Sequence, residues 1–195
     1  PFGSRFTLEG KEYTISLAGR HQCFHAQMVL ALLPILQQAG FGVTRQHAAK
    51  AFAHTHFPGR FQVLCRRPFV VVDGAHNPEG VAGLKEILSH IPCPKKIAAG
   101  MLGDKAVEEN LKLLAGQSDT LFCLPVDNPR ALSPKELAAL ARPYFARVAC
   151  FETVEQGLAA ALEELDPEEM LLVCGSFFLA GEAVAALGSL LPEGK

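Results

Sequence analysis

Asp73, His76 and Asn77 bring a carboxylate, an imidazole and a carboxamide together within one short turn. They follow Val70-Val71-Val72, three β-branched residues that favour an extended and buried strand. Open α/β sheets bind their ligands just beyond the carboxyl ends of the strands. We therefore expect these side chains to contact a ligand. The alternative is a plain strand-turn-helix connection in which Asp73 caps the helix.

Three more polar clusters follow predicted strands further along the chain. They are Gly100 to Lys105, Asp127 to Arg130, and Gly175-Ser176. If the strands are parallel, their carboxyl ends lie at one edge of the sheet, and the four clusters can form one shared site.

The residue types in these clusters suit an anionic ligand with several parts. The carboxylate of Asp73 can accept both hydroxyls of a ribose. Arg60 offers a fork of donors for phosphate, and Lys105 offers a point charge. Ser176 can donate to a carboxylate. The alternatives are solvated surface charges for Arg60 and Lys105, and a strand end beside a helix cap for Ser176.

The spacing of apolar residues after position 60 predicts alternating strands and helices, typical of a mostly parallel, doubly wound α/β sheet. The predicted strands cover 61–64, 68–72, 96–101, 120–124, 148–151 and 170–174. The predicted helices cover 78–90, 106–114, 133–141, 154–165 and 181–191. Earlier in the chain we expect two strands, at 6–8 and 13–17, and two helices, at 23–38 and 44–53. Pro58-Gly59 interrupts all periodicity and marks a boundary.

Composition limits the class of protein. The 195 residues are 49% hydrophobic and 19% charged, enough for a sizeable core. A net charge of −2 argues against a broad nucleic-acid surface or an anionic membrane as a partner. The six cysteines are scattered without a CxxC motif, which favours reduced thiols in a cytoplasmic protein. His54 and His56 lack further ligands at the spacing that zinc requires.

Several familiar motifs are missing from the sequence. It has no GxxxxGK[ST] phosphate loop, no GxGxxG after its first strand and no GxSxG elbow. A nucleotide would therefore lack its usual backbone cradle in this chain, and dehydrogenase and α/β-hydrolase functions are disfavoured.

Six short motifs occur in a fixed order along nearly the whole chain. They are Gly19-Arg20-His21-Gln22, Pro58-Gly59-Arg60-Phe61, Asp73-Gly74-Ala75-His76-Asn77-Pro78, Gly100-Met101 with Asp104-Lys105, Pro129-Arg130-Ala131, and Gly175-Ser176-Phe177-Phe178. Together they resemble the C-terminal half of the folylpolyglutamate synthase/dihydrofolate synthase family, which belongs to the Mur-ligase superfamily of ATP-dependent amide-forming ligases. The resemblance implies that residues 1–57 are the tail of a central ATPase domain. Residues 58–195 would form a smaller, Rossmann-like C-terminal domain.

The resemblance also implies a reaction. In that family ATP phosphorylates the terminal carboxylate of a folate or dihydropteroate substrate, and the amine of L-glutamate then attacks the acyl phosphate. Arg60 would reach the ATP phosphates and Asp73 would hold the ribose. His76 and Ser176 would lie near the glutamate, with Lys105 as a partner for its carboxylate.

The resemblance also implies where the nucleotide base and the metal bind. The family motif that contains Gln22 is followed by an asparagine near the adenine, and this chain has His25 there. An imidazole can still stack on a purine or hydrogen-bond with it. The phosphate loop and the Mg²⁺ ligands would precede this chain, so we expect no metal ligand here. Because the chain starts at Pro1 rather than Met, we expect a fragment that is inactive alone.

Two other functions remain open from the sequence. One is a Mur-type ligase that adds an amino acid to a UDP-linked muramoyl substrate, and the other is a non-catalytic, Rossmann-like binding module. The resemblance implies small-molecule substrates (ATP, L-glutamate, and folate or dihydropteroate), no nucleic-acid or membrane partner, and a monomer. The pterin specificity and the length of the glutamate chain stay undetermined.

Overall fold

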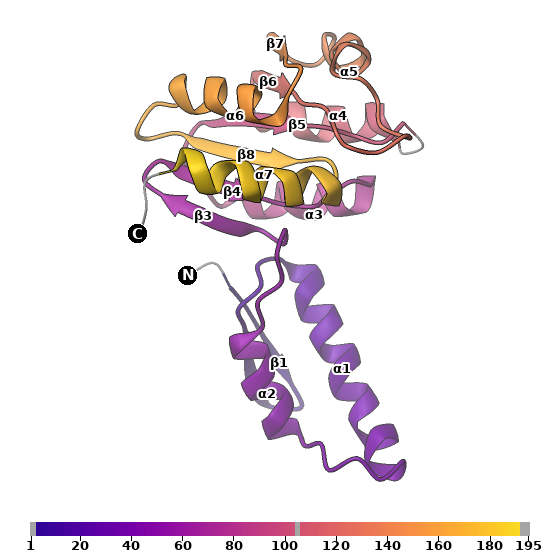
Figure 1. Ribbon diagram of the computed structural model, residues 1–195. Coiled ribbons are helices and arrows are strands. Elements are labelled where there is room, and N and C mark those ends of the chain that lie inside the picture. Colours follow the sequence, from indigo (N-terminus) through magenta and orange to yellow (C-terminus); the bar gives the residue numbers. More distant parts are fainter. Residues whose placement is uncertain (1–2, 104–105, 192–195) are drawn as a thin grey trace. The chain divides into compact units, whose positions relative to one another are not determined.

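The computed structural model describes residues 3–103 and 106–191 and divides the chain into two compact units, residues 1–57 and 58–195 (Figure 1). No helix in these described ranges combines the length and the apolar character needed to cross a membrane. The assignment of the two units to an ATPase tail and a ligase domain stays a prediction.

The first unit packs a hairpin against two helices. Its elements are β1 (Ser4–Leu8), β2 (Lys11–Ile15), α1 (Arg20–Gln38) and α2 (Arg45–His54). Glu9 and Gly10 both have positive φ angles, of 51° and 74°, as a two-residue turn between antiparallel strands requires. Thr44 caps α2, since its hydroxyl accepts the N–H of His47 at 3.2 Å. The core of this unit includes Tyr13, Ile15, Leu30, Leu33 and Phe52.

The second unit contains a six-stranded sheet in the order β3-β4-β8-β5-β6-β7. The strands are β3 (Gln62–Arg66), β4 (Phe69–Val72), β5 (Lys95–Ala99), β6 (Thr120–Cys123), β7 (Arg147–Cys150) and β8 (Met170–Cys174). Strands β4 to β8 are mutually parallel, and only the edge strand β3 is antiparallel to its neighbour β4. The predicted fold class, a mostly parallel α/β sheet, is confirmed.

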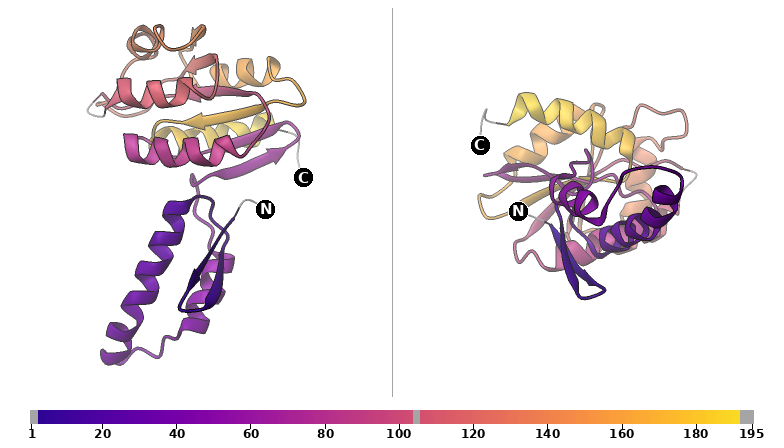
Figure 2. Two further views of the ribbon diagram at one scale, coloured as in Figure 1. Left: turned by 180° about the vertical axis from the view of Figure 1, so that it is seen from behind. Right: turned by 90° about the horizontal axis from the view of Figure 1, so that it is seen from below.

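Helices cover both faces of this sheet (Figure 2). They are α3 (Pro78–Ser89), α4 (Val107–Ala115), α5 (Pro134–Ala141), α6 (Val154–Glu163) and α7 (Phe177–Leu190). Helices α3, α4 and α5 lie on one face, while α6 and α7 pack together on the other. The strands β4, β5, β6 and β8 are almost completely buried between these layers. This burial explains why their sequences are continuous apolar runs.

Several predicted boundaries differ from the observed ones: the helix predicted at 23–38 begins at Arg20, and the strand predicted at 13–17 ends at Ile15. Two of the differences have a clear local reason. The last helix begins at Phe177 rather than at Gly181, because the hydroxyl of Ser176 accepts the N–H of Phe178 at 3.1 Å and caps the helix four residues earlier. The first strand of the second unit begins at Gln62 rather than at Phe61, because Phe61 has a φ of 42° and belongs to a turn.

Candidate active site at the carboxyl edge of the sheet

The polar residues after β4, β6 and β8, and residues 100–103 after β5, lie at one edge of the sheet, because these strands are parallel. Strand β4 leads into α3 on one face, and its neighbour β8 leads into α7 on the opposite face. Adjacent strands whose connections leave to opposite faces create a crevice, the usual ligand site of open α/β sheets. Asp73 and His76 follow β4, and Ser176 follows β8, so the sequence-predicted residues border this crevice.

The Asp73 carboxylate joins two loops. Its Oδ2 accepts the backbone N–H of Phe61 at 2.7 Å, and its Oδ1 accepts the N–H of Ala75 at 2.8 Å. The side chain is almost fully buried. Burial raises the pKa of Asp73, while the two N–H groups and the charge of Arg60 act in the opposite direction. The helix cap considered for Asp73 belongs instead to Asn77, whose Oδ1 accepts the N–H of Gly80 at 3.0 Å.

Arg60 reaches this edge because β3 is antiparallel. The amino end of β3 lies beside the carboxyl end of β4, where Gln62 pairs with Val72. The loop before β3 is held there by the Asp73 carboxylate and by a 2.7 Å bond from the N–H of Gly74 to the carbonyl of Gly59. Arg60 lies in this loop and is partly exposed.

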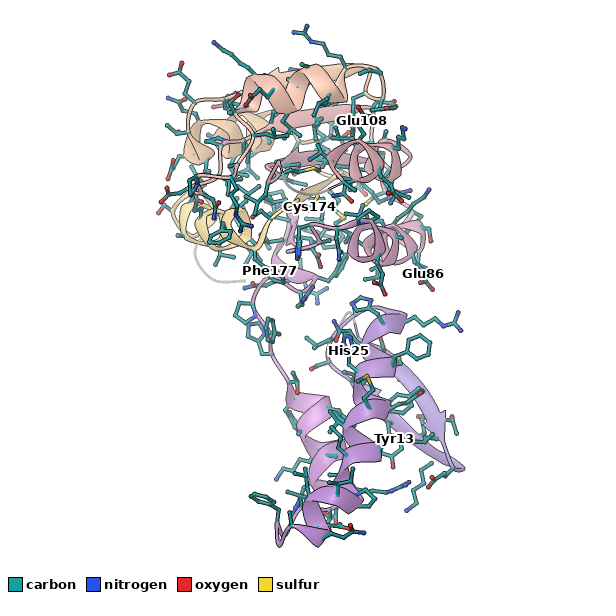
Figure 3. All side chains as sticks on the ribbon, turned by 90° about the vertical axis from the view of Figure 1, so that its right-hand side faces the viewer. Tyr13, His25, Glu86, Glu108, Cys174 and Phe177 are labelled. Carbon is teal, nitrogen blue, oxygen red and sulfur yellow. The ribbon has the colours of Figure 1, made fainter. Side chains whose placement is uncertain are left out.

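The ring of Phe177 contacts two of the candidate residues. The guanidinium carbon of Arg60 lies 4.5 Å from the centre of this ring, and the His76 ring centre lies 5.6 Å from it. Figure 3 labels Phe177 and also Cys174, the last residue of β8. Burial and the neighbouring Asp73 both raise the pKa of the Cys174 thiol, so this cysteine stays protonated.

His76 is held by two backbone contacts. Its Nδ1 lies 2.9 Å from the carbonyl oxygen of Gly74, which can only accept a hydrogen bond. Nδ1 therefore carries a proton, and in the neutral ring Nε2 is an acceptor. The carbonyl of His76 accepts a hydrogen bond from Nδ2 of Asn110 at 3.1 Å. This fully buried amide ties the His76 turn to α4.

Ser176 lies where three strand ends meet. The N–H of Gly175 donates to the carbonyl of Ala75 at 2.9 Å. Gly175 has a φ of 105°, and a Cβ there would lie 2.7 Å from the carbonyl oxygen of Gly100. Ser176 is 2% exposed and caps α7. The positive end of the α7 dipole and the guanidinium of Arg60 both favour an anion at this edge.

The remaining predicted residues belong to the first unit or lie outside the described residues. Gln22 and His25 belong to the first unit, where Nδ1 of His25 lies 3.4 Å from Oε1 of Gln22. Figure 3 labels His25 on this unit. Lys105 lies outside the described residues. Their ligand contacts, like those of Arg60, Asp73, His76 and Ser176, stay predictions.

Sequence analysis missed Asn110 and Phe177 as parts of this site. Asn110 occupies an inward position in the helical pattern of Val107, Leu111 and Leu114, and a polar residue at such a position is a usable signal. Phe177 gives no comparable signal, because its contacts come from loops distant in the sequence.

The described residues, apart from the gap at 104–105 and the two ends, contain no group of three or more His, Cys, Asp or Glu side chains that could hold a metal ion.

Comparisons with known proteins show the family of the chain. The model of the family described as "Mur ligase, glutamate ligase domain" matches residues 59–177. The dihydrofolate synthase/folylpolyglutamate synthase of Escherichia coli (strain K12) is 28% identical over 165 residues, which cover 84% of this chain and 38% of that protein. The chain therefore spans less than half of this relative. The predicted resemblance to the C-terminal half of that family is confirmed.

Two solved structures share the fold. E. coli FolC in complex with ADP, without folate substrate, has a TM-score of 0.78 and 26% identity, covering 95% of this chain and 44% of that one. A bifunctional folylpolyglutamate synthase/dihydrofolate synthase with Mn, AMPPNP and L-glutamate bound has a TM-score of 0.70 and 28% identity, covering 80% of this chain and 38% of that one.

Proposed function

The chain belongs to the Mur ligase glutamate ligase domain family, and from this premise we propose that it is the C-terminal part of an ATP-dependent ligase that joins L-glutamate to a folate-type carboxylate. The observation that carries the proposal is the convergence of Arg60, Asp73, His76 and Ser176 at one edge of a single unit. Similar proteins with ADP, AMPPNP, Mn and L-glutamate bound support the ligand classes.

In the proposed reaction the substrate carboxylate attacks the γ-phosphorus of ATP, giving an acyl phosphate and ADP. The amine of L-glutamate then attacks the acyl carbon, and inorganic phosphate leaves as the amide forms. Both steps depend on positioning and on neutralising negative charge. A divalent cation would supply part of that neutralisation, and we propose that its ligands lie outside this chain.

Each residue has a proposed role in this scheme. Arg60 contacts the ATP phosphates, where its planar fork suits phosphoryl oxygens. Asp73 accepts from the ribose hydroxyls with the lone pairs that Phe61 and Ala75 leave unused. His76 and Ser176 position the incoming glutamate.

Three further residues have proposed roles. Lys105 would pair with the carboxylate of the glutamate. Gln22 and His25 contact the adenine from the first unit.

The test is a ligase assay on the intact protein that contains this chain, with ATP, L-glutamate and either dihydropteroate or a reduced folate. Product mass and ADP release should show the addition of one glutamate. His76→Ala should remove most of this activity while the protein stays folded. His90→Ala is the matched control, because His90 is exposed at the other end of α3. Equal turnover in the two variants would refute the role of His76.

The same assay separates the alternatives. Activity only with a UDP-muramoyl substrate would assign the protein to the cell-wall branch of the family. Binding without turnover of any substrate would favour a non-catalytic module. The 195-residue chain alone should bind ATP weakly, since it has no GxxxxGK[ST] loop. Tight binding in calorimetry would contradict that expectation.

A further inference from the structure

The aromatic ring of Phe177 lies against two side chains that come from different loops. Arg60 belongs to the loop before β3, and its guanidinium carbon is 4.5 Å from the ring centre. His76 belongs to the turn after β4, and its ring centre is 5.6 Å away with an interplanar angle of 60°. The Phe177 side chain is only 37% exposed, so part of the ring is packed and part is open.

Both loops place a glycine next to this ring, and at Gly74 the missing Cβ leaves space that the ring occupies. A Cβ on Gly74 would lie 2.4 Å from two carbon atoms of the Phe177 ring, a distance that no real contact tolerates. A Cβ on Gly59 would lie 3.7 Å from the same two atoms, and Gly59 has a φ of 71°. Gly59 precedes Arg60 directly and Gly74 lies two residues before His76. The backbone that carries each polar side chain is therefore fitted to the ring.

The contacts of the ring restrict both polar groups. A guanidinium over an aromatic face is attracted by the ring quadrupole, and this attraction restricts the long and flexible arginine side chain. The imidazole of His76 is fixed between the Phe177 ring and the carbonyl of Gly74. Side chains that are ordered before a ligand arrives lose less conformational entropy on binding it.

We propose that Phe177 is a positioning residue that orients Arg60 and His76 together, and so couples the phosphate-binding part of the site to the glutamate-binding part. This inference rests on the proposed function for the roles of Arg60 and His76. Phe177 acts through these two residues and takes no part in bond making.

The first test uses the 195-residue chain and its NMR spectrum. Ring currents from Phe177 should shift the side-chain protons of Arg60 upfield from their random-coil positions. Phe177→Tyr should keep these shifts, and Phe177→Leu should remove them. Phe178→Leu is the matched control, because Phe178 is the next residue and 49% exposed. Random-coil shifts for Arg60 in the unmutated chain would overturn the proposal without any variant.

The second test uses the intact protein in the ligase assay. Phe177→Leu should raise KM for both ATP and L-glutamate by about 3–10-fold, the range expected from losing one cation–π contact and its preorganisation. Phe177→Tyr and Phe178→Leu should stay within about 2-fold of the unmutated enzyme. A purely structural role would instead lower the folded fraction, and so the apparent kcat, with KM unchanged. That result, or a change in only one of the two KM values, would overturn the coupling.

The two tests distinguish the inference from the proposed function. If the intact protein adds no glutamate, the proposed function fails and the NMR spectra alone decide whether Phe177 orders Arg60. If the protein is active and Phe177→Leu leaves both KM values unchanged, the positioning role fails and the function stands.

Discussion

The backbone N–H of Phe61 donates to the carboxylate of Asp73 over 2.7 Å and so joins the loop before β3 to the turn after β4. The same carboxylate also accepts the N–H of Ala75, which means that one buried side chain satisfies two backbone donors. Asp73 is therefore part of the hydrogen bonding that holds the fold together, as well as a candidate ligand-binding residue.

Replacing Asp73 by alanine should lower the free energy of unfolding by about 2 kcal/mol, because two buried N–H groups would lose their acceptor. The loss of these bonds outweighs the relief of a buried charge. Urea unfolding of the 195-residue chain measures the change. Asp127→Ala is the control, since Asp127 is exposed at the same edge and should change stability by less than about 0.5 kcal/mol. Equal effects of the two substitutions would contradict the structural role of Asp73.

Replacing Gly74 by alanine should destabilise the second unit by about 1–3 kcal/mol, because the added methyl group overlaps the Phe177 ring. Gly181→Ala makes the same chemical change within α7, where nothing lies within 4 Å of the new methyl group. There alanine should stabilise by about 0.5–1 kcal/mol, because it favours the helix over the unfolded chain. Denaturation midpoints that move in the same direction for both variants would refute the steric argument.

The ion pair of Lys96 and Glu169 should make stability depend on pH. Lys96 Nζ lies 2.8 Å from the Glu169 carboxylate, and both side chains are mostly buried. Burial alone would raise the pKa of Glu169, but the bond from Lys96, the N–H of Asp166 and the Lys96 charge together lower it below 4.5. Because the pKa of Glu169 is lower in the folded state, the pair stabilises the protein at pH values above 4.5, the pKa of the unfolded state. This stabilisation is lost as the pH falls through the folded-state pKa.

Glu169→Gln should therefore cost about 1 kcal/mol at neutral pH and progressively less below pH 4.5. Unfolding free energies measured from neutral pH down to the acid range test this. Glu168→Gln is the neighbouring control at an exposed position. A difference between Glu169→Gln and the unmutated chain that does not shrink in acid would exclude the ion pair as its source.

Thiol reactivity should follow burial. Burial raises the pKa of Cys123 to about 12, and Cys174 is also fully buried, whereas Cys150 is exposed. Because the thiolate is the reactive form, an alkylating reagent at neutral pH should modify Cys150 well before Cys123 or Cys174. Mass spectrometry of the folded chain reads the order directly. Early labelling of Cys174 would show that the sheet opens near its carboxyl edge.

Much of the fold could be predicted because its signals are local. Buried parallel strands are continuous apolar runs. The starts of helices are indicated by capping residues such as Thr44 and Ser133, which cap α2 and α5. The start of α7 was predicted four residues too late, because Phe177 to Ala180 form an apolar run with no helical period. Gly181 was therefore predicted to begin the helix, although it lies inside α7. The alternative given for Ser176, a strand end beside a helix cap, is what the structure shows.

The candidate site was only partly predictable. Sequence patterns indicate which polar residues follow strands, and the parallel sheet then brings them to one edge. Patterns cannot supply the contacts between loops, such as Phe61 with Asp73 or Phe177 with Arg60, because these pairs are distant in the chain. Asn110 is intermediate, since its helical position signals burial but does not reveal its bond to the carbonyl of His76.

Because β3 is antiparallel to β4, the second unit begins at the same edge of the sheet as the candidate site. Residues 58–60 are the first residues of that unit, and they also lie at the carboxyl edge of the sheet, beside the candidate site. The chain therefore runs directly from residue 57 into the candidate site. A change in backbone conformation just before Pro58 would therefore alter the position of Arg60 directly, because only two residues separate them and no strand of the sheet lies in between.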